Sequence, residues 1–162
     1  LSAGGEVDLL VRKLNHLVAE GLDFDQVLDA ITAYQSKTKL LFVLAKVDNL
    51  VKNGRLSKLV GTVVGLLNIR MVGEASKTGT LELLQKARGQ KKAIKAAFDE
   101  LIKAGYTGGH ITIAHRNNEK FIEQFSELVR EKFAQASIEV LPTSGLCSFY
   151  AEEGGLLMGY EI

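Results

Sequence analysis

The stretch "NIRMVGEASKTGTLELLQKAR", residues 68–88, decides what kind of sheet this chain can form. It consists of two extended halves separated by Lys77, Thr78 and Gly79. A tight turn between two strands favours a residue that tolerates positive φ, and Gly79 supplies one. The stretch therefore predicts a β-hairpin, so the sheet must be at least partly antiparallel.

Upstream of this hairpin, the run "LLFVLA" (40–45) is short and continuously apolar, as expected of a strand that is buried on both faces. Two short helices are expected to follow it, over 46–53 and 56–67, because Asn53 and Gly54 interrupt the pattern between them. This part of the chain therefore joins a central strand to the hairpin through helical turns.

The N-terminal part of the chain predicts two helices. A capping-box pattern of Asp23 and Gln26 begins the second helix, and Gly21 ends the first. The first helix is expected to carry apolar residues at helical spacing, namely Val7, Leu10, Val11, Leu14 and Val18.

Downstream of the hairpin, a helical stripe from Ala93 to Ile102 is closed by Gly105. A strand, "GHITIAH", and a helix capped by Asn117 or Asn118 come next. Three further strands are expected, "SIEVL", "LCSFY" and "LLMGYEI", with the last two forming a second hairpin around "AEEGG". The order predicts an α/β (α+β-like) fold with a mixed, largely antiparallel β-sheet and packed helices.

Composition narrows the classes of function. The chain has 162 residues with 46% hydrophobic residues, which suits one globular domain. A net charge of +1 gives no overall field that favours nucleic acid. The uncharged segment Leu59–Ile69 is shorter than the ~20 residues of a membrane span. The single cysteine, Cys147, excludes an internal disulfide and fits a reduced, cytoplasmic compartment. Cys147 is expected to be a buried small hydrophobic residue.

No catalytic or metal-binding pattern is found. The three histidines have no carboxylate or cysteine at ligand spacing, and Ser144 lacks the frame of a nucleophile elbow. The chain is therefore expected not to be an enzyme and to bind no metal.

The basic run "KARGQKKAIK" (86–95) has two interpretations, an anion or nucleic-acid patch and a solvated helix face. Lys91, Lys92 and Lys95 lie opposite the apolar stripe of the following helix, which is typical of a solvated helix face. Arg88 differs, because it stands where a strand meets a helix and the helix dipole favours anions.

Gly61 and Gly65 lie four residues apart within a predicted helix, where each glycine costs about 1 kcal/mol relative to alanine. One interpretation is close packing of the helix against the sheet. The other is a slot for a long apolar ligand, lined by Val60, Val64, Leu67 and Ile69.

The order of several motifs resembles the C-terminal domain of the DegV family of bacterial fatty-acid-binding proteins. "FVLAKVDNLVKNGRLSK" resembles the family's strand followed by its "L-x-x-L-x-x-G-G-R-I-S" turn. "GLLNIRMVGEASKTGTLELLQKARGQKKA" resembles its "L-L-N-I-K-P-I … G … R-x-x-K-A" segment, and "ITIAHRNNE" resembles "I-x-H-A". The ending "YAEEGGLLMGY" resembles "H-T-G-P-G-A-L-G-I-G-F".

The resemblance implies that residues 1–162 form a lipid-binding domain whose N-terminal partner domain is absent from this chain. A long-chain fatty acid would be the bound ligand, without a further cofactor, and its tail would occupy an apolar pocket. The pocket residues implied are Gly61, Val64, Gly65, Leu67 and Ile69.

The resemblance also implies where the carboxylate of the fatty acid would lie. The N-terminal domain would contribute hydroxyls, and Tyr150 stands where the family has a histidine that holds this carboxylate. Glu152 and Glu153 stand in place of Gly-Pro and are expected to repel an anion.

Some family members present the carboxylate to a separate, dihydroxyacetone-kinase-like fatty-acid kinase. By this resemblance, Arg55 and Arg88 would contact that kinase, with Arg55 at the mouth of the binding region. The alternative function is a regulatory or scaffolding domain that contacts proteins and binds no lipid.

Overall fold

The computed structural model of the chain describes residues 3–56, 68–76 and 78–162. Its centre is a six-stranded sheet with the strand order β3-β2-β1-β6-β4-β5. Strands β4 and β5 are parallel, and every other neighbouring pair is antiparallel, which confirms the predicted fold class. The strands are β1 (Thr38–Leu44), β2 (Ile69–Ala75), β3 (Leu81–Arg88), β4 (His110–His115), β5 (Ser137–Pro142) and β6 (Leu156–Glu161).

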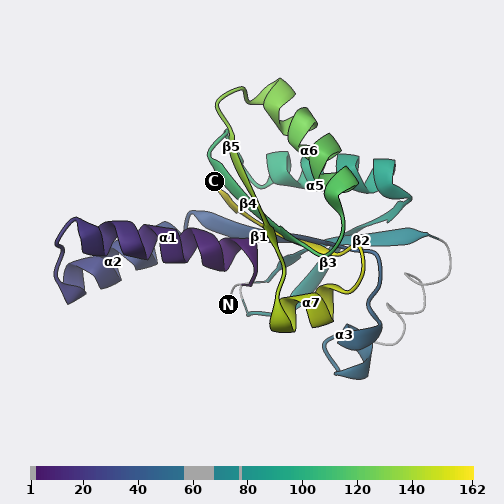
Figure 1. Ribbon diagram of the computed structural model, residues 1–162, viewed down its shortest axis with the longest axis horizontal. Helices are drawn as coiled ribbons and strands as arrows, with labels where there is room; N and C mark the ends of the chain where they lie inside the picture. The colour runs from purple at the N-terminus through teal and green to yellow at the C-terminus, as the bar shows by residue number, and fades with distance from the viewer. Residues whose placement is uncertain (1–2, 57–67, 77) are drawn as a thin grey trace.

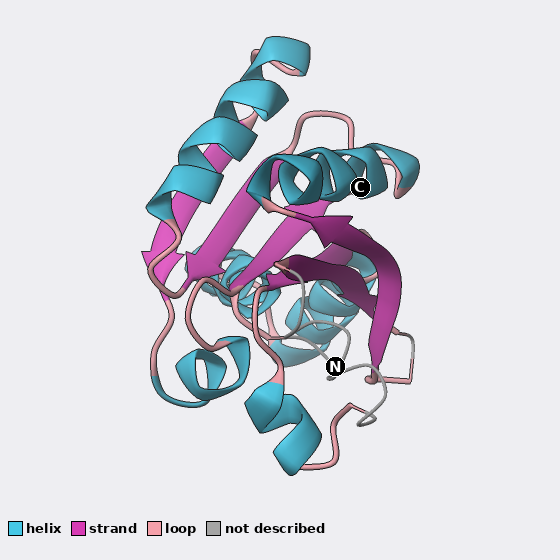
Figure 2. Ribbon diagram, turned by 90° about the vertical axis from the view of Figure 1, so that its right-hand side faces the viewer, coloured by secondary structure: helices cyan, strands magenta, loops and turns pink. Residues whose placement is uncertain are grey.

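Helices cover both faces of this sheet. Helices α5 and α6 lie on one face, and the short helices α3 and α7 lie on the other (Figures 1 and 2). Helices α1 and α2 lie side by side (Figure 1), and α1 also packs against β1, β4 and β6. The helices are α1 (Gly5–Ala19), α2 (Phe24–Gln35), α3 (Asp48–Lys52), α5 (Gln90–Lys103), α6 (Glu119–Lys132) and α7 (Gly145–Ala151).

Strand β1 sends alternate side chains into two separate cores. Leu41 and Val43 join the larger core beneath α5 and α6. Phe42 and Leu44 join a smaller core with Leu50 of α3 and Ala151 of α7. Successive side chains of a strand point to opposite faces, so a strand that is apolar at every position must be covered on both sides. The predicted double burial of this strand is confirmed.

Local signals in the sequence identified several elements correctly. The hairpin is confirmed, and its turn is closed by a bond from Ser76 N to Thr80 O at 2.8 Å. The capping box of α2 is confirmed: Asp23 Oδ1 accepts from Gln26 N at 2.9 Å, and Asp23 N donates to Gln26 Oε1 at 3.0 Å. Asn118 occupies the N-cap of α6, but its side chain donates to Gly154 O rather than capping the helix.

The prediction that 146–150 form a strand is wrong, because this segment is the helix α7. No second hairpin exists around "AEEGG", since β6 pairs with β1 and β4. Both edges of β6 are thus occupied by distant strands, and aromatic residues favour a strand only where a partner is available. Bonds from Ser148 N to Ser144 O and from Glu152 N to Ser148 O hold the segment as a helix instead.

The predicted helices after β1 are partly described. The first is found as α3, which is shorter than the expected range 46–53. Apart from Leu56, the second expected helix lies outside the described residues.

Helix α1 forms where it was predicted, but its expected apolar stripe is not its buried face. Leu9 and Leu17 are buried, whereas Val18 is 64% exposed. The rotation of the helix is fixed by close contact between backbones, because a Cβ at Gly5 would overlap Thr112 O of β4. A Cβ at Gly159 of β6 would likewise overlap the backbone of Glu6. This approach turns the predicted stripe away from the sheet.

We expect Gly159→Ala to lower the free energy of unfolding by roughly 1–3 kcal/mol, because the added methyl group must displace α1 from the sheet. Chemical denaturation measures this loss. Gly105→Ala is the matched control, since Gly105 has a positive φ but open space around it, so only the backbone cost of about 1 kcal/mol applies. A loss at Gly159 that is no larger than the loss at Gly105 would contradict the close-contact explanation.

Candidate functional site

An apolar cavity of about 560 Å³ lies between the sheet and the pair α3 and α7. Its floor is formed by Leu40, Phe42 and Leu44, which are alternate residues of β1. Leu157 of β6 and Leu81 of β3 extend this floor to either side. At ~3.3 Å per residue, the β1 part of the floor is about 13 Å long. This size and apolar lining are typical of a site for a small apolar ligand.

The walls of the cavity come from the two short helices. Helix α3 contributes Leu50, and the turn after it contributes Gly54 and Arg55. Helix α7 contributes a single face to the opposite wall, formed by Leu146, Cys147, Tyr150 and Ala151. The spacing of these residues fits one side of a helix, so the helical form of α7 is what brings them together.

Two polar groups at the wall of the cavity have no internal partner. The Tyr150 hydroxyl and the Arg55 guanidinium make no hydrogen bond or ion pair with another described residue. Tyr150 packs its ring edge-on against Phe149, with 5.0 Å between ring centroids, so its position is fixed by packing. A neutral hydroxyl and a cation can both donate to an anion, and the site can therefore accept an acidic headgroup next to an apolar tail.

The carboxylates of Glu152 and Glu153 are both engaged within the protein. Glu152 Oε1 accepts from Asn49 N at 2.8 Å. Glu153 accepts from Asn117 Nδ2 at 3.2 Å and lies 4.0 Å from Arg116 Nε. These partners offset the negative charge that the sequence places near the headgroup position.

The structure brings some of the predicted site residues together. Tyr150 and Arg55 both line the cavity, although Tyr150 does so from a helix. The predicted strand placed Ser148 on the side of Tyr150, but Ser148 instead lies 2.8 Å from Thr143 Oγ1 and is not a lining residue.

Other predicted site residues lie elsewhere or are not described. Ile69 begins β2, is partly exposed and is not among the lining residues. Arg88 ends β3 and is exposed, next to the N-cap of α5. The remaining predicted pocket residues lie outside the described residues and stay predictions, namely Val60, Gly61, Val64, Gly65 and Leu67.

The sequence also carries a signal for the cavity floor. The run "LLFVLA" places Leu40, Phe42 and Leu44 at every second position, so one face of the strand is continuously apolar and bulky. Cys147 was expected to be buried, yet it is partly exposed and lines the cavity.

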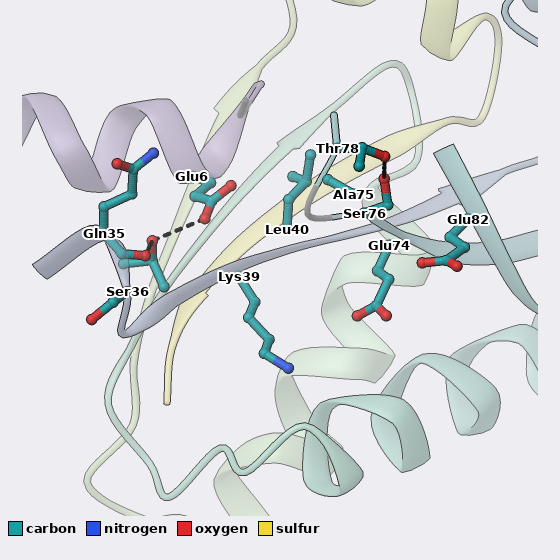
Figure 3. Close-up of a pocket in the computed structure, with 11 residues that line it drawn as sticks. Glu6, Gln35, Ser36, Lys39, Leu40, Glu74, Ala75, Ser76, Thr78 and Glu82 are labelled. Atoms are coloured by element: carbon teal, nitrogen blue, oxygen red, sulfur yellow. Dashed lines mark hydrogen bonds between the residues drawn. The ribbon is translucent and has the colours of Figure 1, made fainter. Parts of the chain in front are cut away.

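A second cavity, of about 640 Å³, is larger but chemically less suited to a lipid. It lies near the start of β1 and the end of β2, and Figure 3 shows the polar side chains that line it. Glu74 and Glu82 are opposite each other on β2 and β3, and the Glu6 carboxylate accepts from Thr38 Oγ1 at 2.9 Å. Three carboxylates with one lysine, Lys39, would repel an anionic headgroup. We therefore assign the apolar cavity as the candidate site.

The described part of the chain contains neither a cluster of metal ligands nor a helix that could span a membrane. Within residues 3–56, 68–76 and 78–162, no group of three His, Cys, Asp or Glu side chains could hold a metal ion. None of the helices described there is both long and apolar enough to cross a bilayer.

Comparison with known proteins identifies close relatives. A DegV domain-containing protein of Streptococcus pneumoniae is 78% identical over 162 residues, which are 100% of this chain and 58% of that protein. The structure of the S. pneumoniae Fatty Acid Kinase (Fak) B3 protein loaded with linoleic acid has a TM-score of 0.97 and 78% identity. The match covers 99% of this chain and 57% of that one.

A more distant structure has the same fold. The DegV family protein from Eubacterium eligens loaded with heptadecanoic acid has a TM-score of 0.94 and 36% identity, covering 99% of this chain and 58% of that one. The chain thus spans little more than half the length of these relatives. The family model described as "Uncharacterised protein, DegV family" matches residues 1–160, so the chain belongs to the DegV family.

Proposed function

We propose that this chain is the C-terminal, lipid-binding part of a fatty-acid-binding protein and that it serves a fatty-acid kinase. The observation that carries the proposal is the apolar cavity with two donors in its wall, Tyr150 and Arg55, whose side chains have no partner among the described residues. The tail of a long-chain fatty acid lies along the β1 floor, and its carboxylate faces these donors. The two similar structures that hold linoleic and heptadecanoic acid support this ligand class.

The energetics of a fatty acid suit such a site. Burial of a long acyl chain at ~0.8 kcal/mol per CH₂ gives on the order of 10 kcal/mol of gross stabilisation. A carboxylate that stays near the protein surface avoids the severe cost of burying an unpaired charge. The rest of the full-length protein, its N-terminal domain, completes the headgroup site with hydroxyl groups. The chain acts as a carrier rather than as an enzyme.

The kinase contact is proposed at the edge of the sheet where Arg88 lies. The Arg88 side chain is exposed and makes no hydrogen bond or ion pair with a described residue, and Arg88 directly precedes Gly89 at the start of α5. Arg70 of β2 pairs with Ala87 of β3 and so lies at the same edge. The Nε and Nη1 atoms of Arg70 are buried and have no partner among the described residues. Burial lowers the pKa of Arg70. This edge therefore carries positive charge that an anionic partner surface would complement.

A second candidate function, a protein-contact domain without lipid, is favoured by one observation. Helices α1 and α2 expose large apolar side chains, and Phe24 is 78% exposed. Grouped apolar residues at a surface often mark a protein contact. The others on these helices are Val7, Val11, Val18 and Leu28.

Alkylation of Cys147 separates the two candidates, because this thiol lines the cavity and is partly exposed. In the full-length protein, we expect saturating linoleic acid to slow the maleimide labelling of Cys147 at least several-fold. Mass spectrometry of the peptide that contains Cys147 measures the extent of labelling over time. In denaturant, the fatty acid should leave the labelling rate unchanged. Equal rates in the folded protein, together with no copurifying fatty acid, would favour the protein-contact domain.

Tyr150→Phe tests the headgroup donor, because it removes the hydroxyl and keeps the ring. A hydrogen bond to a charged group contributes roughly 1.5–3 kcal/mol, so we expect fatty-acid affinity to fall about tenfold or more. Calorimetry measures the affinity, and thermal melting should show unchanged stability. If affinity is equal to that of the unmodified protein, the headgroup is held by the N-terminal domain alone.

Arg88→Glu tests the kinase contact. We expect acyl-phosphate production in a coupled kinase assay to fall by about tenfold at low salt, because a contact charge mainly sets the association rate. Fatty-acid affinity and melting temperature should not change. Arg130→Glu is the matched control, since Arg130 is an exposed arginine in the last turn of α6 and has no role in this proposal. Unchanged turnover in Arg88→Glu would refute the assignment of Arg88 to the kinase contact.

Arg55→Glu is expected to lower both kinase turnover and fatty-acid affinity, because Arg55 lines the cavity.

A further inference from the structure

Glu152 adopts a backbone conformation that is normally restricted to glycine. Its φ of 53° and ψ of −171° place it in a region that β-carbon sterics make unfavourable. The same loop has glycine at Gly155, where a Cβ would overlap Ala151 O. A glutamate in this conformation persists only where its surroundings hold it, and its side chain is one group that can contribute to this.

The Glu152 side chain makes such a contact with helix α3. Its Oε1 atom accepts from the backbone Asn49 N at 2.8 Å. In the opposite direction, Asn49 Nδ2 donates to the backbone oxygen of Phe149 at 2.8 Å. One residue of α3 is therefore bonded twice to the C-terminal end of α7, across about a hundred residues of sequence. We call these three residues, Asn49, Phe149 and Glu152, the α3–α7 contact.

The two helices that this contact joins form facing walls of the cavity. Leu50 directly follows Asn49, and Tyr150 directly follows Phe149, and both Leu50 and Tyr150 line the cavity. Figures 1 and 2 show α3 and α7 as neighbours on the same face of the sheet. Any motion that separates these helices must therefore break the contact and widen the cavity.

Apolar packing alone holds these helices weakly. Leu50 is the buried residue of α3, and Ala151 is the buried residue of α7. Short elements with few buried side chains open at low free energy, so individual hydrogen bonds weigh heavily in their position. A bond from a backbone N–H to a carboxylate is among the stronger ones available.

We propose that Glu152 is a positioning residue that sets how long an acyl chain stays in the cavity. By joining α7 to α3, its carboxylate keeps the two walls together around the ligand. The inference rests on the proposed fatty-acid binding, and it adds that the release rate is controlled at the α3–α7 contact. The backbone strain at Glu152 is retained because the side chain performs this task.

Two substitutions in the full-length protein separate the contact from the strain. Glu152→Ala removes the carboxylate and keeps a β-carbon in the strained conformation, whereas Glu152→Gly removes the carboxylate and relieves the strain. We expect both variants to release bound linoleic acid about tenfold faster than the unmodified protein, as the loss of one charged hydrogen bond implies. We expect Glu152→Gly to melt at a higher temperature than Glu152→Ala, because glycine adopts this backbone conformation without strain. Glu152→Gly therefore provides a folded variant if Glu152→Ala is unstable.

The matched control is Glu123→Ala, because Glu123 is an exposed glutamate of α6, on the opposite face of the sheet from α3 and α7. It should release linoleic acid at the unmodified rate. Release is measured as the transfer of radiolabelled linoleic acid from the protein to an excess of phosphatidylcholine vesicles. Unchanged release from both Glu152 variants would overturn the inference and leave fatty-acid binding intact.

Amide exchange of Asn49 in the ligand-free protein gives an independent readout. The Asn49 N–H should be protected in the unmodified protein and should exchange faster in Glu152→Gly. An unprotected Asn49 N–H in the unmodified protein would also overturn the inference. If the unmodified protein retains no linoleic acid at all, the proposed function fails, which is a different result from equal release rates.

Discussion

The double burial of β1 is the constraint on which the rest of the molecule depends. Both edges of β1 are paired, with β2 and β6, and both of its faces are apolar. The chain must therefore place helices on both sides of the sheet. Two 14-residue helices, α5 and α6, fill one side, whereas α3 and α7, with 5 and 7 residues, lie on the other. The apolar cavity is the part of the second core that these short helices leave open.

Features that depend on neighbours in sequence were predictable from sequence. The hairpin, the capping box of α2 and the apolar strand β1 each arise from residues a few positions apart, so the signal and the structure share the same short segment. The cavity floor belongs to this class as well, because alternation along β1 places Leu40, Phe42 and Leu44 on one face. Tyr150 was expected at the headgroup, and Arg55 at the mouth of the binding region as a kinase contact, only through the family resemblance.

Features that depend on distant residues were not predictable in the same way. Helix α7 is not a strand because β6 is already paired on both edges, by β1 and β4, which are far away in sequence. The orientation of α1 follows from the close approach of Gly5 to β4. The spacing of apolar residues along α1 does not predict this contact. The partners of Glu152 and Glu153, which are Asn49 of α3 and Asn117, likewise lie 103 and 36 residues away in the sequence. Charge near the headgroup position could therefore be counted from the sequence, but its compensation could not.

The sheet also explains why the acyl tail and the carboxylate of the proposed fatty-acid ligand can contact different parts of the protein. Alternate pairings make β1, β3 and β4 run in the same direction, so their C-terminal ends share one edge. Here the edge holds Arg88 at the end of β3 and the half-buried guanidinium of Arg70, while the apolar floor runs inward along β1. Under the proposed function, an acyl chain is dehydrated along the strand while its anionic end faces Tyr150 and Arg55 near solvent, where a charge costs least. The cations at this edge of the sheet remain available to a partner.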